Sequence, residues 1–383
     1  MSGDHVTTLT ERPERGAPGR IRTAKQEPLK APEVAPSRPK RARSAILMTV
    51  LAVALIAACL ASGMIGQLFI PPQEVLGFFL NSIGIHWIDG PSHEFGAAAL
   101  AEVRFPRLVL TVFVGAALAV GGVLMQGIFG NPLAEPGSVG VSSGAAVGAS
   151  FSILFGFTFL GPFTTPAFAF AAGLITTFLV YMLSRTGGRT EVITLILTGV
   201  AVNAVCGALI AFITFRAPTQ AREQIVFWQM GSLNGSRWEQ VMLVGPLIII
   251  GIVLSVLLAR QLDLLSLGEK AARHVGVNVE RLRVLVMVYV ALLVSSAVAF
   301  AGIIAFVGLV VPHIIRMIIG PAHRALLIAS VLGGALLLTI ADLAARTLVE
   351  FADLPIGMLT SLVGGPFFFY LIRASRKSGG GWK

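Results

Sequence analysis

Four neighbouring residues at the end of a long apolar stretch are the first candidates for function in this chain. Residues 108–134 carry no charged side chain, and the sequence from 126 to 136 is QGIFGNPLAEP. Hydrocarbon accepts the apolar part, but an amide side chain, an asparagine and two prolines need protein or water around them. This end should therefore be buried in protein or line an aqueous path. The candidate pathway residues are Gln126, Asn131, Pro132 and Leu133.

The segment 262–283, with the sequence LDLLSLGEKAARHVGVNVERLR, combines helix caps with surface charge. Ser266 and Glu269 have the spacing of a capping box, and Gly276 is placed to end the same short helix. Asn278 can cap a second short helix. We expect a docking platform for a partner protein, with an ordinary amphipathic loop as the alternative. Its small apolar face is predicted from Ala271, Ala272 and Val275.

Patterns typical of catalytic and metal sites are missing from the sequence. It has no His-Glu-x-x-His motif, no paired aspartates in the apolar runs and no serine with a plausible base, so an intramembrane enzyme is not expected. The glycine clusters lack the Gly-Lys-Ser/Thr ending of a nucleotide site, so the chain is not expected to hydrolyse ATP. His313 has no second ligand at useful spacing, and Cys59 and Cys206 are interpreted as small core hydrophobes. We predict no metal site and no cofactor.

The composition is that of an integral membrane protein. Hydrophobic residues make up 55% and charged residues 13% of the 383 residues, and the mean hydropathy is +0.83. Soluble domains carry roughly a quarter charged residues. A membrane helix needs about 20 apolar residues, so two of the charge-free stretches can hold two spans each. Ten spans are predicted in all, from the stretches 44–73, 108–134, 136–184, 192–215, 241–259, 284–315, 325–341 and 354–372.

Basic residues orient these spans, because Lys and Arg concentrate on the cytoplasmic side of a membrane. Most of them fall in the N-terminal tail and in the segments 185–189, 260–283, 316–324 and 373–383. Both termini are therefore predicted to be cytoplasmic, and the net charge of +10 reflects topology and not a nucleic-acid partner. The arginines left outside are Arg104, Arg107, Arg216, Arg222, Arg237 and Arg346.

Three regions follow from this pattern. Residues 1–43 are rich in Pro, Arg, Lys and Glu, and we expect a disordered basic cytoplasmic tail that can contact anionic membrane lipid. Residues 44–375 form the transmembrane domain, with a cytoplasmic loop at 260–283. Residues 376–383 form a cytoplasmic C-terminal tail.

An ion-coupled secondary transporter is the main alternative to a transporter driven by a partner. Such carriers bury acidic or basic groups within their spans, whereas Glu191 and Asp342 stand at span ends here. A purely structural role is disfavoured, because buried Gln126, Asn131 and Asn203 would cost stability. We therefore expect the energy for transport to come from outside the chain.

Several motifs then stand in a specific order between about residues 104 and 372. They are Arg104-Phe-Pro-Arg107, Asn131-Pro-Leu-Ala-Glu-Pro136, Gly140-Val-Ser142, Leu267-Gly-Glu269 with Ala272 and Gly276, Phe306-Val-Gly-Leu309, Pro312-His313, Ala341-Asp342 with Arg346, and Leu354-Pro-Ile-Gly357. Together they resemble the permease subunit of the ABC importers for iron-siderophores, haem and cobalamin, the FecCD type of type II importers.

The resemblance implies an all-α integral membrane protein of about ten transmembrane helices with the type II ABC importer permease fold. It further implies a homodimer around a central pathway in a bacterial cell membrane. A cytoplasmic ABC ATPase dimer would dock below it, and an extracytoplasmic substrate-binding protein on its outer face. The substrate would be an iron chelate, either a ferric siderophore or haem, with cobalamin as the alternative.

The resemblance also assigns roles to single residues. Asn131 and Leu133 match positions of the inner gate. Arg104, Arg107 and Arg346 match outer arginines that pair with acidic residues of the binding protein, with interfacial snorkelling as the alternative for the first two. The residues matching the segment that couples to the ATPase are Leu267, Gly268, Glu269, Ala272 and Gly276.

Overall fold

The computed structural model describes residues 40–187 and 189–377. In this part of the chain seven helices are long and apolar enough to cross a membrane, and three shorter apolar helices accompany them. The first group belongs to α1 (Lys40–Met64), α4 (Phe105–Phe129), α6 (Thr164–Leu183), α7 (Val192–Arg216), α9 (Trp238–Leu257), α12 (Val279–Ala301) and α14 (His323–Ala345), and the shorter three are α5 (Val141–Phe155), α13 (Val307–Ile319) and the apolar part of α15 (Ile356–Lys377).

The ten helices correspond to the ten predicted spans, in the same order. The stretch 136–184 breaks between α5 and α6, where Gly161 adopts a φ of 57°. The stretch 284–315 breaks between α12 and α13 at Gly302, whose φ is 68°. Glycine reaches such values without the steric cost that other residues meet, so both breaks lie where the backbone tolerates a reversal.

Short elements connect the spans. They are α2 (Pro72–Ser82), α3 (Gly96–Ala98), the π-helical η1 (Ala99–Arg104), the 3-10 turns η2 (Pro136–Val139) and η3 (Gly161–Phe163), the strands β1 (Arg185–Thr186) and β2 (Arg189–Thr190), and the helices α8 (Thr219–Met230), α10 (Ala259–Leu265) and α11 (Glu269–His274). The two strands pair antiparallel as a small hairpin, the one departure from helix among the described residues. Helix α1 begins at Lys40, four residues before the predicted span. The rest of the predicted tail, and residues 378–383, lie outside the described residues.

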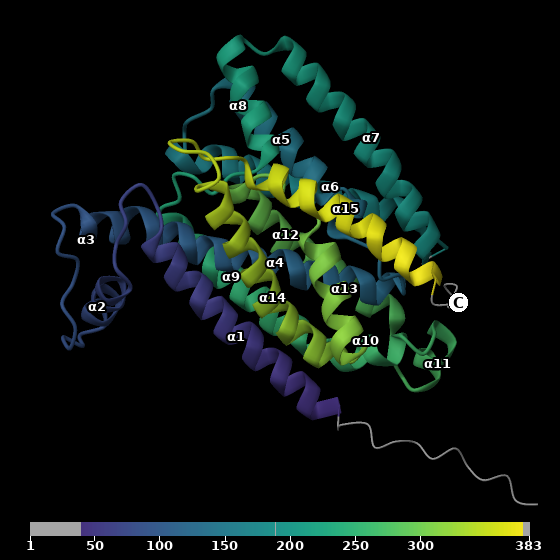
Figure 1. Cartoon of the computed structure of the whole chain (residues 1–383). Coiled ribbons are helices and arrows are strands. Elements are labelled where there is room, and N and C mark those ends of the chain that lie inside the picture. Colours follow the sequence, from purple (N-terminus) through teal and green to yellow (C-terminus); the bar gives the residue numbers. More distant parts are fainter. Residues whose placement is uncertain (1–39, 188, 378–383) are drawn as a thin grey trace, which may run out of the picture. The chain divides into compact units, whose positions relative to one another are not determined.

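Helix α4 is the centre of the bundle, packed against α9, α12, α13 and α14, as Figure 1 shows. Its close neighbours depend on small residues. A Cβ added at Gly122 would overlap the carbonyl oxygen of Gly308 on α13, and one at Gly115 would overlap that of Gly334 on α14. Backbone-to-backbone approach of this kind is how small residues join membrane helices. Gly115 and Gly122 therefore serve helix packing.

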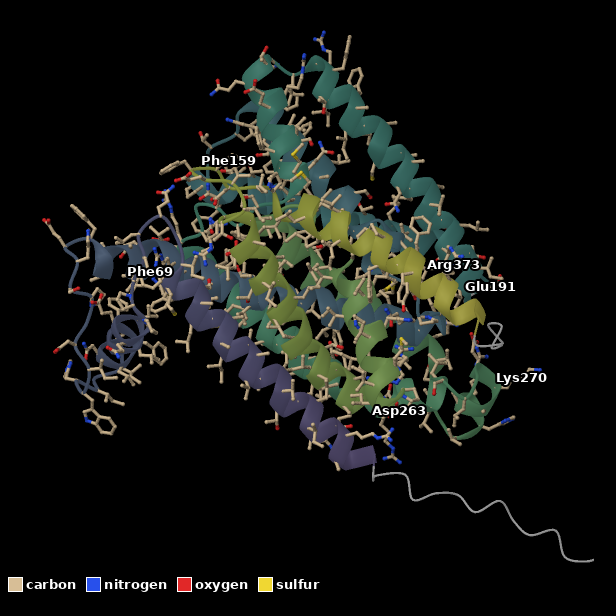
Figure 2. All side chains as sticks on the ribbon, viewed as in Figure 1. Phe69, Phe159, Glu191, Asp263, Lys270 and Arg373 are labelled. Atoms are coloured by element: carbon tan, nitrogen blue, oxygen red, sulfur yellow. The ribbon has the colours of Figure 1, made fainter. Side chains whose placement is uncertain are left out.

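The connecting segments separate into two ends of the bundle. Figure 2 shows Phe69 and Phe159 at one end, and Glu191, Asp263, Lys270 and Arg373 at the other. Helix α7 is only lightly embedded between these ends, since it buries four residues, Leu195, Gly199, Cys206 and Ile213, and only α1 is less buried among the long helices of the described residues. Most of its surface is thus available to lipid or to another subunit.

Candidate functional sites

The loop between α9 and α12 contains α10 and α11, and only the first of the two predicted short helices is present, as α11; the cap predicted for it at Ser266 is wrong. Helix α11 begins after Gly268, whose φ of 104° suits glycine, and Ser266 instead donates its hydroxyl to the Asp263 carbonyl at 2.6 Å. No capping box forms at Glu269, because its carboxylate accepts from Arg283 and, at 3.4 Å, from Arg273. Local spacing could not reveal these arginine partners.

The other two caps behave as predicted in position. The Gly276 and Val277 amides donate to the Arg273 and Ala272 carbonyls at 3.0 Å each, which is a Schellman ending of α11 with Gly276 at a φ of 88°. The Asn278 side chain accepts from the Arg281 amide at 3.0 Å. It caps the long helix α12, however, and not a second short one.

The surface of this loop has a docking character. Leu267 is 72% and Val275 is 62% exposed, whereas Ala272 is buried beneath them. The predicted apolar face is therefore corrected: Ala272 packs inward, and Leu267 lies outward with Val275. A hollow of about 320 Å³ opens beside these residues, lined by Arg273, Gly276, Val277, Asn278, Val279 and Glu280.

Arg283 organises the inner end of this loop, and sequence reasoning missed it. The side chain is 4% exposed. It donates to the Thr190 carbonyl at 2.6 Å, to Glu280 at 3.4 Å and to Glu269. Glu280 in turn accepts from the Thr190 amide at 3.1 Å. An arginine in the first turns of a span was the available signal, but the charge count used it only for topology.

The three outer arginines lie together at the other end of the bundle, yet they are engaged within the chain. Arg107 is 7% exposed and pairs with Asp342 at 2.8 Å and Asp353 at 2.9 Å. Arg346 lies 3.5 Å from the other oxygen of Asp342. Carboxylates from α14 and from the segment that follows it therefore pair with Arg107 and Arg346, and these two arginines are not free to meet acidic residues of another protein in this conformation.

Arg104 and Arg346 also cap the outer end of α1. Arg104, 7% exposed, donates to the carbonyls of Gly63, Met64 and Leu68. Arg346 donates to the carbonyls of Ser62 at 2.7 Å and Ile65 at 3.1 Å. The last carbonyls of a helix have no partner within it, so two guanidinium groups supply one here. These arginines fasten α1 to α4 and α14.

Gln126 has a structural environment. It is 1% exposed, and its amide nitrogen lies 3.4 Å from the carbonyl oxygens of both Gly308 and Leu309. Pro312 has no amide hydrogen and leaves the Gly308 carbonyl without its helical partner. Arg316 completes the arrangement by donating to the Gln126 side-chain oxygen at 3.1 Å. Gln126 thus replaces a hydrogen bond that α13 lacks, and it is not accessible to water in this conformation.

The rest of the predicted gate lies on the connector between α4 and α5. Asn131 is exposed, contrary to the buried position expected for it, and its side chain accepts from the Leu133 amide at 2.9 Å. Pro132 and Leu133 are half-buried. Glu135 follows, and burial raises the pKa of its carboxyl above the usual range. The connector is therefore a tight turn that presents Asn131 at the end of α4 near the α10–α11 loop.

The connector is held from one side by α7. Asn203 donates to the Gly137 carbonyl at 3.1 Å and accepts from Ser143 at 2.5 Å. A Cβ at Gly199 would overlap the Ser138 carbonyl. Asn203, predicted to be a buried polar residue, thus joins α7 to η2 and α5 from a half-buried position.

Comparison with known proteins matches this architecture. A family model described as the FecCD transport family matches residues 53–374. The hemin transport system permease protein HmuU of Yersinia pestis is 44% identical over 73% of this chain and 84% of its own length. The cobalamin import system permease protein BtuC of Halobacterium salinarum is 42% identical over 73% of this chain and 76% of its own.

A solved structure agrees. It is described as an inward-facing conformation of an ABC transporter assigned to the metal-chelate type, and it aligns with a TM-score of 0.73 at 33% identity. The alignment covers 86% of this chain and 99% of that one. The fold and the two ends of the bundle define the membrane-spanning subunit of a transporter. The chain belongs to the FecCD transport family, and so it is a permease subunit of an ABC importer, with ATP hydrolysis in a separate subunit.

Proposed function

We propose that this permease forms a homodimer that imports an iron chelate, either haem or a ferric siderophore, driven by a cytoplasmic ABC ATPase dimer. The observation that carries the proposal is the α10–α11 loop. It presents Leu267 and Val275 to solvent beside a hollow lined by both polar and apolar residues, at the end of the bundle where basic residues gather. A surface of that kind fits a protein partner better than lipid, since apolar and charged groups alternate on it.

Orientation follows from the charge pattern. The α10–α11 loop and the C-terminal end of α15 share one end of the bundle, and that end carries most of the flanking Lys and Arg. We therefore assign this end, and both termini, to the cytoplasm. The opposite end, with α2, α3 and α8, then faces outward and receives the extracytoplasmic substrate-binding protein.

The docking of that binding protein is assigned to the outer end around Arg104, Arg107 and Arg346. In this conformation the three arginines hold α1, α4 and α14 in place, so their contribution to docking is to shape the outer surface. Direct pairing with acidic residues would require Arg107 to leave Asp342 and Asp353. Breaking a buried ion pair is costly, so we give the shaping role precedence.

The inner gate is assigned to Asn131, Pro132 and Leu133. Their turn lies at the cytoplasmic end of the central helix α4, and α7 braces it through Asn203. The role is steric: the turn closes or opens a path between two copies of the chain. Gln126 supports the gate from behind by holding α13 to α4.

The first test is purification of the tagged full chain in mild detergent from its host, with quantification of co-purifying proteins. We expect a cytoplasmic ATPase in a near-equal amount. A Glu269→Lys variant and a Gly276→Val variant should lose the ATPase and transport, while membrane insertion and dimerisation persist. An Arg281→Gln variant, at an exposed position on the next turn, is the matched control.

The outcomes separate the alternatives. A stable oligomer without any ATPase, reproduced under crosslinking, would contradict the proposal and favour an ion-coupled carrier. If the ATPase is present, the co-purifying binding protein supplies the substrate test, in which haem, a ferric siderophore and cobalamin are titrated in parallel. Binding of cobalamin alone would replace the iron chelate by the alternative that the Halobacterium relative's name suggests.

A further inference from the structure

Arg283 joins three elements that are far apart in the sequence. Its guanidinium reaches Thr190 at the end of β2, Glu269 at the start of α11 and Glu280 on its own helix α12. The Arg283 side chain is 4% exposed, so its bond to the Thr190 carbonyl is shielded from competing water, whereas its partner Glu269 is 45% exposed. Charge-assisted hydrogen bonds of this kind are roughly twice as strong as neutral ones.

The contact with Thr190 bears directly on α7. Residue 191 is the cap of α7, so no linker separates the strand held by Arg283 from the first turn of that helix. Glu280 reinforces the contact by accepting from the Thr190 amide at 3.1 Å. Figure 2 shows Glu191, at the start of α7, and Lys270, on α11, at the same end of the bundle. Arg283 therefore connects α11 to the start of α7 through a few short bonds.

Helix α7 leads from that point to the gate turn. Its packing on the rest of the chain is sparse, with four buried positions in 25 residues. One of these, Gly199, lies against the Ser138 carbonyl, and Asn203 holds the Gly137 carbonyl at 3.1 Å. A rigid helix with few lateral contacts transmits a displacement along its length. Movement at Thr190 would therefore shift α7 and, with it, the turn η2 that follows Asn131–Leu133.

The cluster around Arg283 is also incompletely satisfied. Among the described residues, the Thr190 hydroxyl, one Glu280 oxygen and the Arg283 Nε atom are buried without a hydrogen-bond partner. Buried polar atoms are rarely left unpaired, because each one costs free energy. The Arg283 cluster therefore has spare donors and acceptors, which a second arrangement of the same side chains could pair.

We propose that Arg283 is the positioning residue that couples the ATPase-docking helix α11 to α7, so that a displacement of α11 moves the inner end of α7 and, with it, the gate turn. The proposal rests on the assignment of α11 as the docking helix. It adds the route by which that helix acts on the pathway, and it gives Glu269 a second task, as the α11 end of the connection.

The test compares three glutamine variants of the full chain, assembled with the ATPase in lipid vesicles. Arg283→Gln should lower substrate transported per ATP hydrolysed by about tenfold, the scale of a typical coupling free energy, while ATPase binding changes little. The thermal midpoint should fall because a buried charge is lost, so the ratio is measured on the folded, assembled protein. Arg324→Gln changes an exposed arginine in the first turn of α14, and Arg281→Gln changes an exposed arginine two residues from Arg283. Both controls should keep the wild-type ratio.

Two results would overturn the proposal. One is a wild-type ratio in Arg283→Gln. The other is loss of ATPase binding by a stable Arg283→Gln protein, which would show that Arg283 only orders α11. If the wild-type chain itself binds no ATPase, the docking assignment fails instead, and the two failures are thereby distinguished.

A second measurement avoids any change at Arg283, in case that variant does not fold. Spin labels are placed at the exposed positions Ala271, Ile193 and Ile328, on α11, α7 and α14, after Cys59 and Cys206 are replaced by alanine. On ATP binding, the 271–193 distance should stay constant while the 193–328 distance changes. A changing 271–193 distance would mean that α11 and α7 move independently, and the proposal would be wrong.

Discussion

Single residues in this permease serve mainly to satisfy groups that the fold leaves unpaired. The Gln126 amide donates to the Gly308 carbonyl, which Pro312 leaves without a helical partner. Arg104 and Arg346 donate to carbonyls at the C-terminal end of α1. The amide at 126 was recognised in the sequence as out of place in lipid, which was correct. Its partner could not be found that way, because Pro312 lies 186 residues further on and spacing does not reveal contacts across the bundle.

The ion pair between Arg107 and Asp342 is expected to be essential for stability. Both side chains are buried, so removing one charge leaves the other buried without a partner. This lowers the free energy of unfolding by about 3–5 kcal/mol. Arg107→Gln should therefore lower the thermal midpoint of the solubilised chain in the absence of any binding protein. Arg216→Gln, an exposed arginine at the same end, is the control. An unchanged midpoint for Arg107→Gln would restore a docking role for this residue.

Glu135 should make stability depend on pH. Burial raises its carboxyl pKa above the ordinary value of 4.5, so the folded chain binds the proton more tightly than the unfolded chain. Stability then falls as pH rises from the ordinary pKa to the raised one, and it stays lower above that window. Glu135→Gln should be more stable than wild type at neutral pH and equal to it under acidic conditions, as measured by thermal midpoints from about pH 4 to about pH 8. A pH-independent difference, or one shared by the exposed Glu94→Gln, would contradict this.

At the scale of elements, hydropathy predicts the fold well. The ten helices and their order follow from the charge-free stretches, whereas the division of the stretch 284–315 at Gly302 comes from the structure and was not predicted. The sites were predicted less completely. Gly276 and Asn278 cap helices because capping is a local property, whereas the burial of Arg107 and the connections of Arg283 depend on which helices become neighbours. The capping box predicted at Ser266 is wrong for the same reason, because Glu269 pairs with Arg283 of α12.

The contact between α4 and α13 provides the prediction at this scale. Gly122→Ala places a methyl group on the Gly308 carbonyl, and a backbone oxygen in a packed helix cannot turn aside. Overpacking typically costs about 1–3 kcal/mol, so the thermal midpoint and the monodisperse yield should both fall. Gly207→Ala in α7 meets nothing within 4 Å and should be neutral or slightly stabilising, because alanine favours helix. Equal behaviour of the two variants would contradict this account of α4.

At the scale of the whole molecule, the proposed homodimer would form its pathway between exposed faces of two copies of the chain. The turn η2, which follows Asn131–Leu133, rests against α7, and α7 offers most of its surface outward, including Leu197 and Val200. In a homodimer around the gate, this face must lie near its symmetry mate, because a two-fold interface brings the same surface patch of both subunits together. Face-to-face proximity of two copies of α7 is therefore the structural requirement of the proposed importer.

Cysteine crosslinking in native membranes tests that requirement. On a background without Cys59 and Cys206, Leu197→Cys or Val200→Cys should give crosslinked dimers at about five times the yield of Val53→Cys, since a two-fold interface pairs like positions. Val53 lies on the exposed face of α1, away from the gate turn, and serves as the lipid-facing control. Adding ATP to the assembled importer should change the yield at 197 and not at 53, because α7 moves with α11 while α1 is fastened by Arg104 and Arg346. Equal yields at all three positions would mean that α7 faces lipid and that the pathway is formed by another surface.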